Sequence, residues 1–183
     1  MKFLVVIDMQ NDFVDGALGT AEAVAVVDNV VKEIQCWAGP VICTRDTHGP
    51  RYLDSQEGRK LPVVHCVKGT DGWQLNPQVQ AAAEAAGAVL LDKPSFGSTD
   101  LPFVIRQIVA AHATDDRTLD SMIDRIELIG ICTDICVISN AMILKAAFPE
   151  VPISVKASCC AGVTPEQHDT ALAAMRPCQI DIL

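Results

Sequence analysis

The stretch "KFLVVID" (residues 2–8) decides the fold, because it is apolar almost throughout and ends at a carboxylate. Strands of this kind are typical of a parallel sheet whose two faces are both covered by helices. The same pattern recurs along the chain. Further strands are expected at "PVICTRD" (40–46), "AVLLDK" (88–93), "IELIGI" (126–131), "PISVKA" (152–157) and "CQIDIL" (178–183).

Helical patterns separate these strands. Within 21–38 the apolar residues recur at helical spacing, and the Gly-Pro pair at 39–40 ends the pattern. Strands that alternate with helices predict an α/β fold, here a Rossmann-like three-layer α/β/α sandwich with a six-stranded, mainly parallel sheet. Further helices are expected at 76–86, 101–112, 135–148 and from 164 onward.

Length and composition favour one globular domain that spans residues 1–183. Hydrophobic residues make up 50% of the chain and charged residues 20%, which excludes a disordered protein. The net charge is −9 and the basic residues occur singly, so we expect neither a nucleic-acid nor a membrane partner. The high apolar content allows a homo-oligomer without requiring one.

The N-terminal sequence lacks the features of a targeting signal. Its apolar run is too short for the core of a signal peptide, and no apolar run reaches the roughly 20 residues that span a bilayer. We therefore expect a cytoplasmic protein. In that compartment the eight cysteines should be reduced, most of them serving as small buried hydrophobic residues.

Polar residues gather at the carboxyl ends of the expected strands, where ligands bind in open α/β sheets. Asp8 follows the first strand, Asp46 and His48 the second, and Lys93 the third, while "CTDIC" (132–136) follows the fourth. If these strands are neighbours, a carboxylate, an ammonium group and a thiol converge on one rim. Each also has a simpler interpretation: a turn-capping aspartate, a surface lysine and a core thiol.

Cys136 is the stronger of the two cysteines as a nucleophile. Thr133 or Asp134 could cap helix 135–148, which would place Cys136 in the first helical turn, where the helix dipole stabilises a thiolate. Cys132 lies in the preceding bend, where backbone N–H groups can form an oxyanion hole.

The segment between the second and third strands contains possible metal ligands. Asp46, His48, Asp54, Glu57 and His65 lie within 20 residues of one another. Two histidines with carboxylates can bind Zn²⁺, Fe²⁺ or Mn²⁺. The alternative is an ordinary solvated loop.

Four motifs in this order resemble the isochorismatase-like cysteine hydrolases, and particularly the nicotinamidase/pyrazinamidase type. They are "VVIDMQNDFVDG" (5–16), "TRDTH" with the later "HCVKGT" (44–48 and 65–70), "DKPSFGSTDL" (92–101) and "GICTDICV" (130–137). The resemblance covers roughly residues 3–165, and the combination is far more specific than any one motif.

The resemblance implies a catalytic triad. Asp8 is the general base, Cys136 the nucleophile, and Lys93 the ion-paired lysine that keeps the carboxylate and the thiolate charged. The family places a cis peptide before the nucleophile, which corresponds to Ile131–Cys132 here. The N–H groups of Cys132 and Cys136 would then form the oxyanion hole.

The resemblance also implies a metal site. Asp46, His48 and His65 match the family's ligands. A further ligand between them is often histidine, and this chain has no histidine between positions 48 and 65. Glu57 is the predicted substitute and Asp54 the fallback. One divalent ion is expected, with Zn²⁺ ahead of Fe²⁺ and Mn²⁺.

The substrate-binding residues follow the family less closely. Phe13 corresponds to the aromatic wall of the substrate site, and Phe96 is a second candidate. An aromatic residue expected before the last histidine ligand is replaced in "LPVVH" (61–65). Trp73 or Tyr52 could take its place.

The predicted function is hydrolysis of nicotinamide to nicotinate and ammonia through a cysteine thioester, with the metal holding the pyridine nitrogen. One alternative is the same chemistry on another small amide or on a ureido or N-carbamoyl compound. A different class is a non-catalytic protein that binds a metal or senses redox state through Cys132 and Cys136 or through Cys159 and Cys160.

Overall fold

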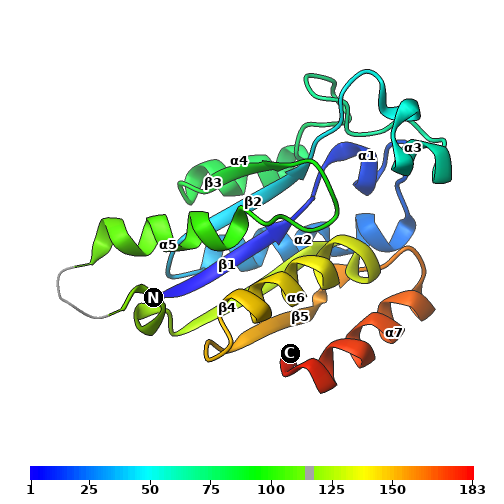
Figure 1. Cartoon of the computed structure of the whole chain (residues 1–183). Coiled ribbons are helices and arrows are strands. Elements are labelled where there is room, and N and C mark those ends of the chain that lie inside the picture. Colours follow the sequence, from blue (N-terminus) through cyan, green and yellow to red (C-terminus); the bar gives the residue numbers. More distant parts are fainter. Residues whose placement is uncertain (114–117) are drawn as a thin grey trace.

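A computed structural model describes residues 1–113 and 118–183, and a six-stranded sheet lies at its centre (Figure 1). The strand order is β3-β2-β1-β4-β5-β6, and each neighbouring pair is parallel. The predicted α/β fold is therefore confirmed. The strands are β1 (Lys2–Ile7), β2 (Val41–Asp46), β3 (Val89–Lys93), β4 (Arg125–Ile131), β5 (Ile153–Ala161) and β6 (Ile180–Ile182).

Helices cover both faces of the sheet, which gives three layers. In Figure 1, α5, α6 and α7 lie in front of the sheet, and α2 and α4 lie behind it. The helices are α1 (Asn11–Val14), α2 (Ala21–Cys36), α3 (Gln56–Lys60), α4 (Pro77–Ala85), α5 (Leu101–His112), α6 (Ile138–Ala147) and α7 (Pro165–Met175). Shorter helical turns are η1 (Tyr52–Asp54), η2 (Leu119–Met122), η3 (Thr133–Val137) and η4 (Arg176–Cys178).

The central strand β1 shows why its sequence is continuously apolar. Phe3, Val5 and Ile7 pack in one core cluster, beneath α5, α6 and α7, while Leu4 and Val6 pack in the other, beneath α2 and α4. All five side chains are fully buried. Burial of each stabilises the fold by about 1.5–3 kcal/mol, so both faces of the strand select apolar residues.

The strand order places a crevice at the carboxyl end of β1. From β1 the chain builds β2 and β3 on one side of the sheet and β4, β5 and β6 on the other. Loops leave β1 and β4 in opposite directions, and such a switch point is where open α/β sheets bind ligands. β4 also lies unusually close to β1 at Gly130, where a Cβ atom would stand 2.1 Å from the carbonyl oxygen of Ile7.

The expected helix 135–148 differs from the prediction. The chain forms a π-helical turn, η3, before α6 begins at Ile138. Neither Thr133 nor Asp134 is the N-cap, because both side chains bond to the region around α7 instead. Thr133 Oγ1 lies 2.8 Å from His168 Nδ1, and Asp134 Oδ1 accepts the N–H of Val163 at 3.0 Å.

β5 is longer than expected and continues through Cys159 and Cys160 to Ala161, both cysteines being buried. Cys43, Cys66 and Cys136 are buried too. Most cysteines therefore pack as small hydrophobic residues, whereas the remaining ones are half-buried or exposed. None of the helices in the described ranges is long and apolar enough to cross a bilayer.

Candidate active site

Asp8, Lys93 and Cys136 meet at the carboxyl edge of the sheet. Lys93 Nζ lies 2.7 Å from Asp8 Oδ2 and 3.6 Å from Cys136 Sγ. Asp8 follows β1, Lys93 ends β3, and Cys136 lies in η3 after β4. The simpler interpretation of Lys93 as a surface residue is wrong, because it is 1% exposed. Asp8 is also fully buried, so it does not cap a solvent-exposed turn.

Lys93 links this cluster to Asp46. Its ammonium lies 3.4 Å from Asp46 Oδ1 and donates a hydrogen bond to the carbonyl of Ser95 at 3.0 Å. Burial alone would lower the pKa of Lys93, but Asp8, Cys136 and Asp46 raise it above its ordinary value. The lysine is therefore a permanent buried cation between two carboxylates.

Burial governs the protonation of the other two groups. It raises the pKa of Cys136 well above the ordinary thiol value; the charge of Asp8 adds to this and Lys93 opposes it. Burial also raises the pKa of Asp8 more than Lys93 lowers it. Lys93 is placed to stabilise a thiolate, as the resemblance implies, and it acts against the effect of burial. Burial thus favours the protonated forms of Cys136 and Asp8, and the charge of Lys93 opposes this at both groups.

The chain around Cys132 has the expected backbone. The Ile131–Cys132 peptide is cis, as the resemblance implies. Cys132 is half-buried and lines the same cavity as Cys136. Its thiol has a pKa raised to about 12, chiefly by burial and by the nearby carboxylates.

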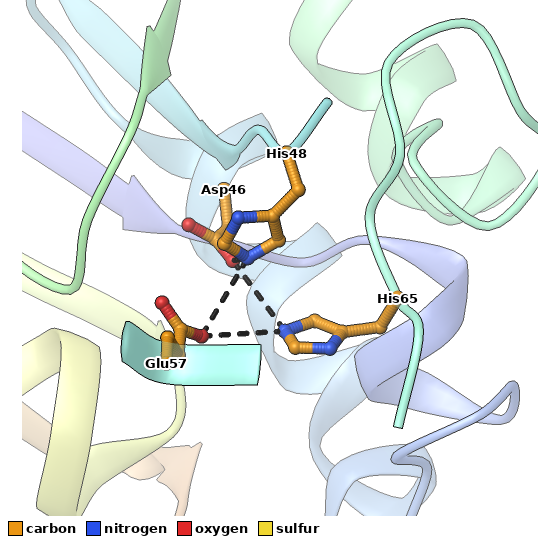
Figure 2. Close-up of side chains that lie close together, drawn as sticks. All are labelled: Asp46, His48, Glu57 and His65. Carbon is orange, nitrogen blue, oxygen red and sulfur yellow. Dashed lines mark ion pairs between the residues drawn. The ribbon is translucent and has the colours of Figure 1, made fainter. Parts of the chain in front are cut away.

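A second cluster consists of Asp46, His48, Glu57 and His65 (Figure 2). One ligand atom from each lies within 4.8 Å of all the others. His48 Nε2 is 2.8 Å from Asp46 Oδ2 and 3.6 Å from Glu57 Oε1, and His65 Nε2 is 3.7 Å from both carboxylates. Asp54, the fallback ligand, is exposed and lies outside the cluster.

The geometry of this cluster fits a divalent metal. His65 Nδ1 lies 2.8 Å from the carbonyl of Val63, which directs its Nε2 toward the two carboxylates. Such an outer hydrogen bond is the usual companion of a metal-binding imidazole. His48 Nε2 is buried without a well-oriented hydrogen-bond partner. Two imidazoles and two carboxylates form a donor set suited to Zn²⁺, Fe²⁺ or Mn²⁺.

The charges within the cluster are balanced against one another. Burial tends to raise the pKa of Asp46, but the close approach of His48 Nε2 at 2.8 Å and the charges of Lys93 and both histidines lower it overall. Burial and the charge of Asp46 raise the pKa of Glu57. One carboxylate is thus ionised over a wide pH range, while the other is more easily neutralised.

A cavity of about 210 Å³ joins the two clusters. Its wall includes Cys132, Cys136, Asp46, Glu57 and His65. This volume lies below the roughly 300–1,000 Å³ typical of sites for drug-sized ligands, so the cavity has the size for a small molecule.

Phe13 and Phe96 both line this cavity. Phe13 is nearly buried and packs against His65 with ring centroids 5.3 Å apart, whereas Phe96 is 44% exposed at the mouth. The suggestion that Trp73 or Tyr52 forms another wall is wrong. Trp73 lies under the guanidinium of Arg45, and Tyr52 packs behind the two histidines. Aliphatic residues complete the wall instead, among them Leu18, Leu61, Ile135 and Val163.

The sequence did not reveal the buried polar residues that support the site. Gln10 Oε1 accepts the N–H of Asp46 at 2.7 Å, and its amide donates to the carbonyls of Asp46 and Trp73. Asn140 donates to the carbonyls of Cys136 and Phe96. In the sequence, Gln10 and Asn140 stand out only as polar residues next to apolar ones.

Comparisons with known proteins find similar sequences and similar folds. The nicotinamidase of Escherichia coli is 29% identical over 193 residues, which cover 95% of this chain and 89% of that protein. The crystal structure of Pyrococcus horikoshii pyrazinamidase in complex with zinc shares 23% identity over 100% of this chain and 98% of its own, with a TM-score of 0.75. The N-carbamoylsarcosine amidase of Thermoplasma acidophilum shares 26% identity over 99% and 94%, with a TM-score of 0.74.

The match to a family is equally extensive. The model of the Isochorismatase domain family matches residues 2–183. The predicted resemblance to this family and to its nicotinamidase/pyrazinamidase type is therefore confirmed. The chain belongs to the isochorismatase family.

Proposed function

We propose that this chain is an amidase that hydrolyses nicotinamide to nicotinate and ammonia. The observation that carries the proposal is the position of Lys93 Nζ between Asp8 Oδ2 and Cys136 Sγ, next to a small cavity that also reaches the Asp46 cluster. The similarity to the Escherichia coli nicotinamidase supports the choice of substrate.

The reaction needs one base and one nucleophile. The carboxylate of Asp8 takes the proton of the Cys136 thiol, and the sulfur attacks the carboxamide carbon. The C–N bond then breaks, and the proton on Asp8 passes to the departing nitrogen, which leaves as ammonia. Water, deprotonated by Asp8, attacks the thioester; the C–S bond breaks, and the thiol and the acid product are released.

Lys93 has an electrostatic role in this scheme. Negative charge on the sulfur, which forms when Asp8 takes the thiol proton, lies 3.6 Å from the buried ammonium and is stabilised by it. The N–H groups of Cys132 and Cys136 stabilise the tetrahedral oxyanion, a contribution of about 3 kcal/mol per donor.

Asp46, His48, Glu57 and His65 would hold one divalent ion, with Zn²⁺ ahead of Fe²⁺ and Mn²⁺. When bound, the ion supplies a Lewis acid that holds the ring nitrogen of the substrate. Phe13 and Phe96 both line the cavity and would contact the ring of the substrate.

A second candidate is the same covalent chemistry on another small amide, ureido or N-carbamoyl compound. The similarity to the N-carbamoylsarcosine amidase favours it, as does the absence from "LPVVH" (61–65) of the aromatic residue that the resemblance implies.

Ammonia release from a panel of amides tests the proposal. The panel contains nicotinamide, pyrazinamide and an N-carbamoyl amino acid, each with and without a chelator, and Cys136→Ala protein serves as the blank. We expect nicotinamide to be turned over and chelation to reduce the rate. Chelator-insensitive turnover of the N-carbamoyl compound alone would favour the second candidate. No turnover of any amide would favour a non-catalytic metal or thiol sensor.

A further inference from the structure

The hydroxyl of Thr44 contacts Asp8 twice. Thr44 Oγ1 donates to Asp8 Oδ1 at 2.7 Å and accepts the backbone N–H of Asp8 at 3.2 Å. Both residues are fully buried, and Thr44 lies within β2, the strand next to β1. A hydroxyl has one proton, and because Thr44 accepts from the N–H its proton is free to go to the carboxylate.

These contacts leave the Asp8 carboxylate little freedom. Thr44 holds Oδ1 while Lys93 holds Oδ2 at 2.7 Å. Asp8 also has a left-handed backbone with φ of 48°, which turns its N–H toward Thr44. Aspartate is one of the few residues with a side chain that tolerates this conformation. The plane of the carboxylate is thus fixed from both sides.

The fold itself gives no reason for a hydroxyl at this position. The neighbouring strand residues Ile42 and Cys43 are apolar and fully buried, and valine has the same shape as threonine and an equal preference for strands. Burying a hydroxyl is unfavourable unless it is hydrogen-bonded. The two bonds to Asp8 account for its presence.

We propose that Thr44 is a positioning residue for the reaction: its hydroxyl aims the Asp8 carboxylate at the Cys136 thiol. This proposal rests on the proposed function, in which Asp8 accepts the thiol proton. Thr44 does not line the cavity and acts only through Asp8. It differs in this from Lys93, which contacts both reacting groups.

Two variants separate the hydroxyl from the shape of the side chain. Thr44→Val removes only the hydroxyl, and Thr44→Ser keeps it. We expect Thr44→Val to lower kcat for nicotinamide about 10- to 100-fold with little change in KM, because general-base catalysis contributes about 100-fold or more. Thr44→Ser should stay within about threefold of the unmodified enzyme. Thr70→Val is the matched control, since Thr70 is exposed and its hydroxyl bonds only to the carbonyl of Val67.

A second measurement needs no substrate turnover. Iodoacetamide alkylation of Cys136, followed by peptide mass spectrometry with the exposed Cys36 as reference, reports how readily the thiol loses its proton. Thr44→Val should slow alkylation of Cys136 about tenfold, and Thr44→Ser should not. An unchanged rate in Thr44→Val, or equal losses in both variants, would overturn the proposal. If the unmodified enzyme releases no ammonia while Thr44→Val still slows alkylation, the proposed function fails and the positioning role stands.

Discussion

The two clusters of the active site are built in different ways. Asp8, Lys93 and Cys136 stand at or just after the ends of β1, β3 and β4, and their relative positions follow from the register of a parallel sheet. In the second cluster only Asp46 belongs to a strand, whereas His48, Glu57 and His65 come from the long connection to α4. The first cluster is buried, but Glu57 remains 20% exposed.

This difference indicates which part of the site is rigid and which is adaptable. A residue at a buried strand end can move only if the sheet moves. Glu57 depends on the short helix α3, whose start is fixed by the Ser55 side chain accepting the N–H of Gly58 at 2.9 Å. Connections of this kind vary more readily than the sheet that supports them. The Asp46, His48, Glu57 and His65 cluster is therefore where residue identity can change while the Asp8–Lys93–Cys136 cluster persists.

The largest effect should come from the nucleophile. Cys136→Ala should lower kcat by at least about 10,000-fold, because the covalent route is lost, without unfolding the protein. Cys132→Ala should stay within about threefold, since its backbone N–H is kept. Ammonia release and thermal melting measure both. Substantial activity in the Cys136→Ala variant would show that Asp8, Lys93 and Cys136 do not carry out the reaction.

An intermediate effect on activity is expected when a residue of the second cluster is replaced. Glu57→Ala should lower metal affinity about 100-fold or more, with a parallel loss of activity and little change in the alkylation of Cys136. Asp54→Ala is the control, because Asp54 is exposed and lies outside the cluster. Metal content after dialysis gives the comparison. Equal loss of metal from the Glu57→Ala and Asp54→Ala variants would contradict the assignment of Glu57 as the ligand.

The last prediction, with the smallest effect per step, is a change of about tenfold in thiol alkylation per pH unit. Burial raises the pKa of Cys132 to about 12 and that of Cys136 in the same direction. Below the pKa the thiolate fraction grows tenfold per pH unit, so alkylation of both should accelerate about tenfold per unit from pH 7 to 9. The same shift affects stability. Below about pH 8.5 the thiols are protonated in both the folded and the unfolded protein, and their contribution to stability is fully present. As the pH rises toward the pKa of the folded protein, only the unfolded chain loses these protons, so the stabilisation is lost. A rate that levels off below pH 9 would indicate a resting thiolate.

Much of this molecule could be predicted from local patterns. Continuous apolar runs predicted the strands, and the helix expected from residue 164 onward is α7, where Thr164 Oγ1 accepts the N–H of Gln167. The turn around Cys136 was predicted less well. Its residues favour a helix, but bonds to His168 and Val163, far along the chain, draw Thr133 and Asp134 away from capping. Local preference cannot anticipate such contacts.

The sequence by itself determined the layers of the fold, the strand ends that carry Asp8, Lys93 and Cys136, and the family. These features depend on side-chain periodicity and on short motifs, and both are local properties of the sequence. Only the tertiary structure decided between Glu57 and its fallback Asp54, showed that Thr44 holds Asp8, and placed the Cys136 thiol where burial raises its pKa. Each of these depends on burial and on contacts between neighbouring strands or loops, which exist only once the chain has packed.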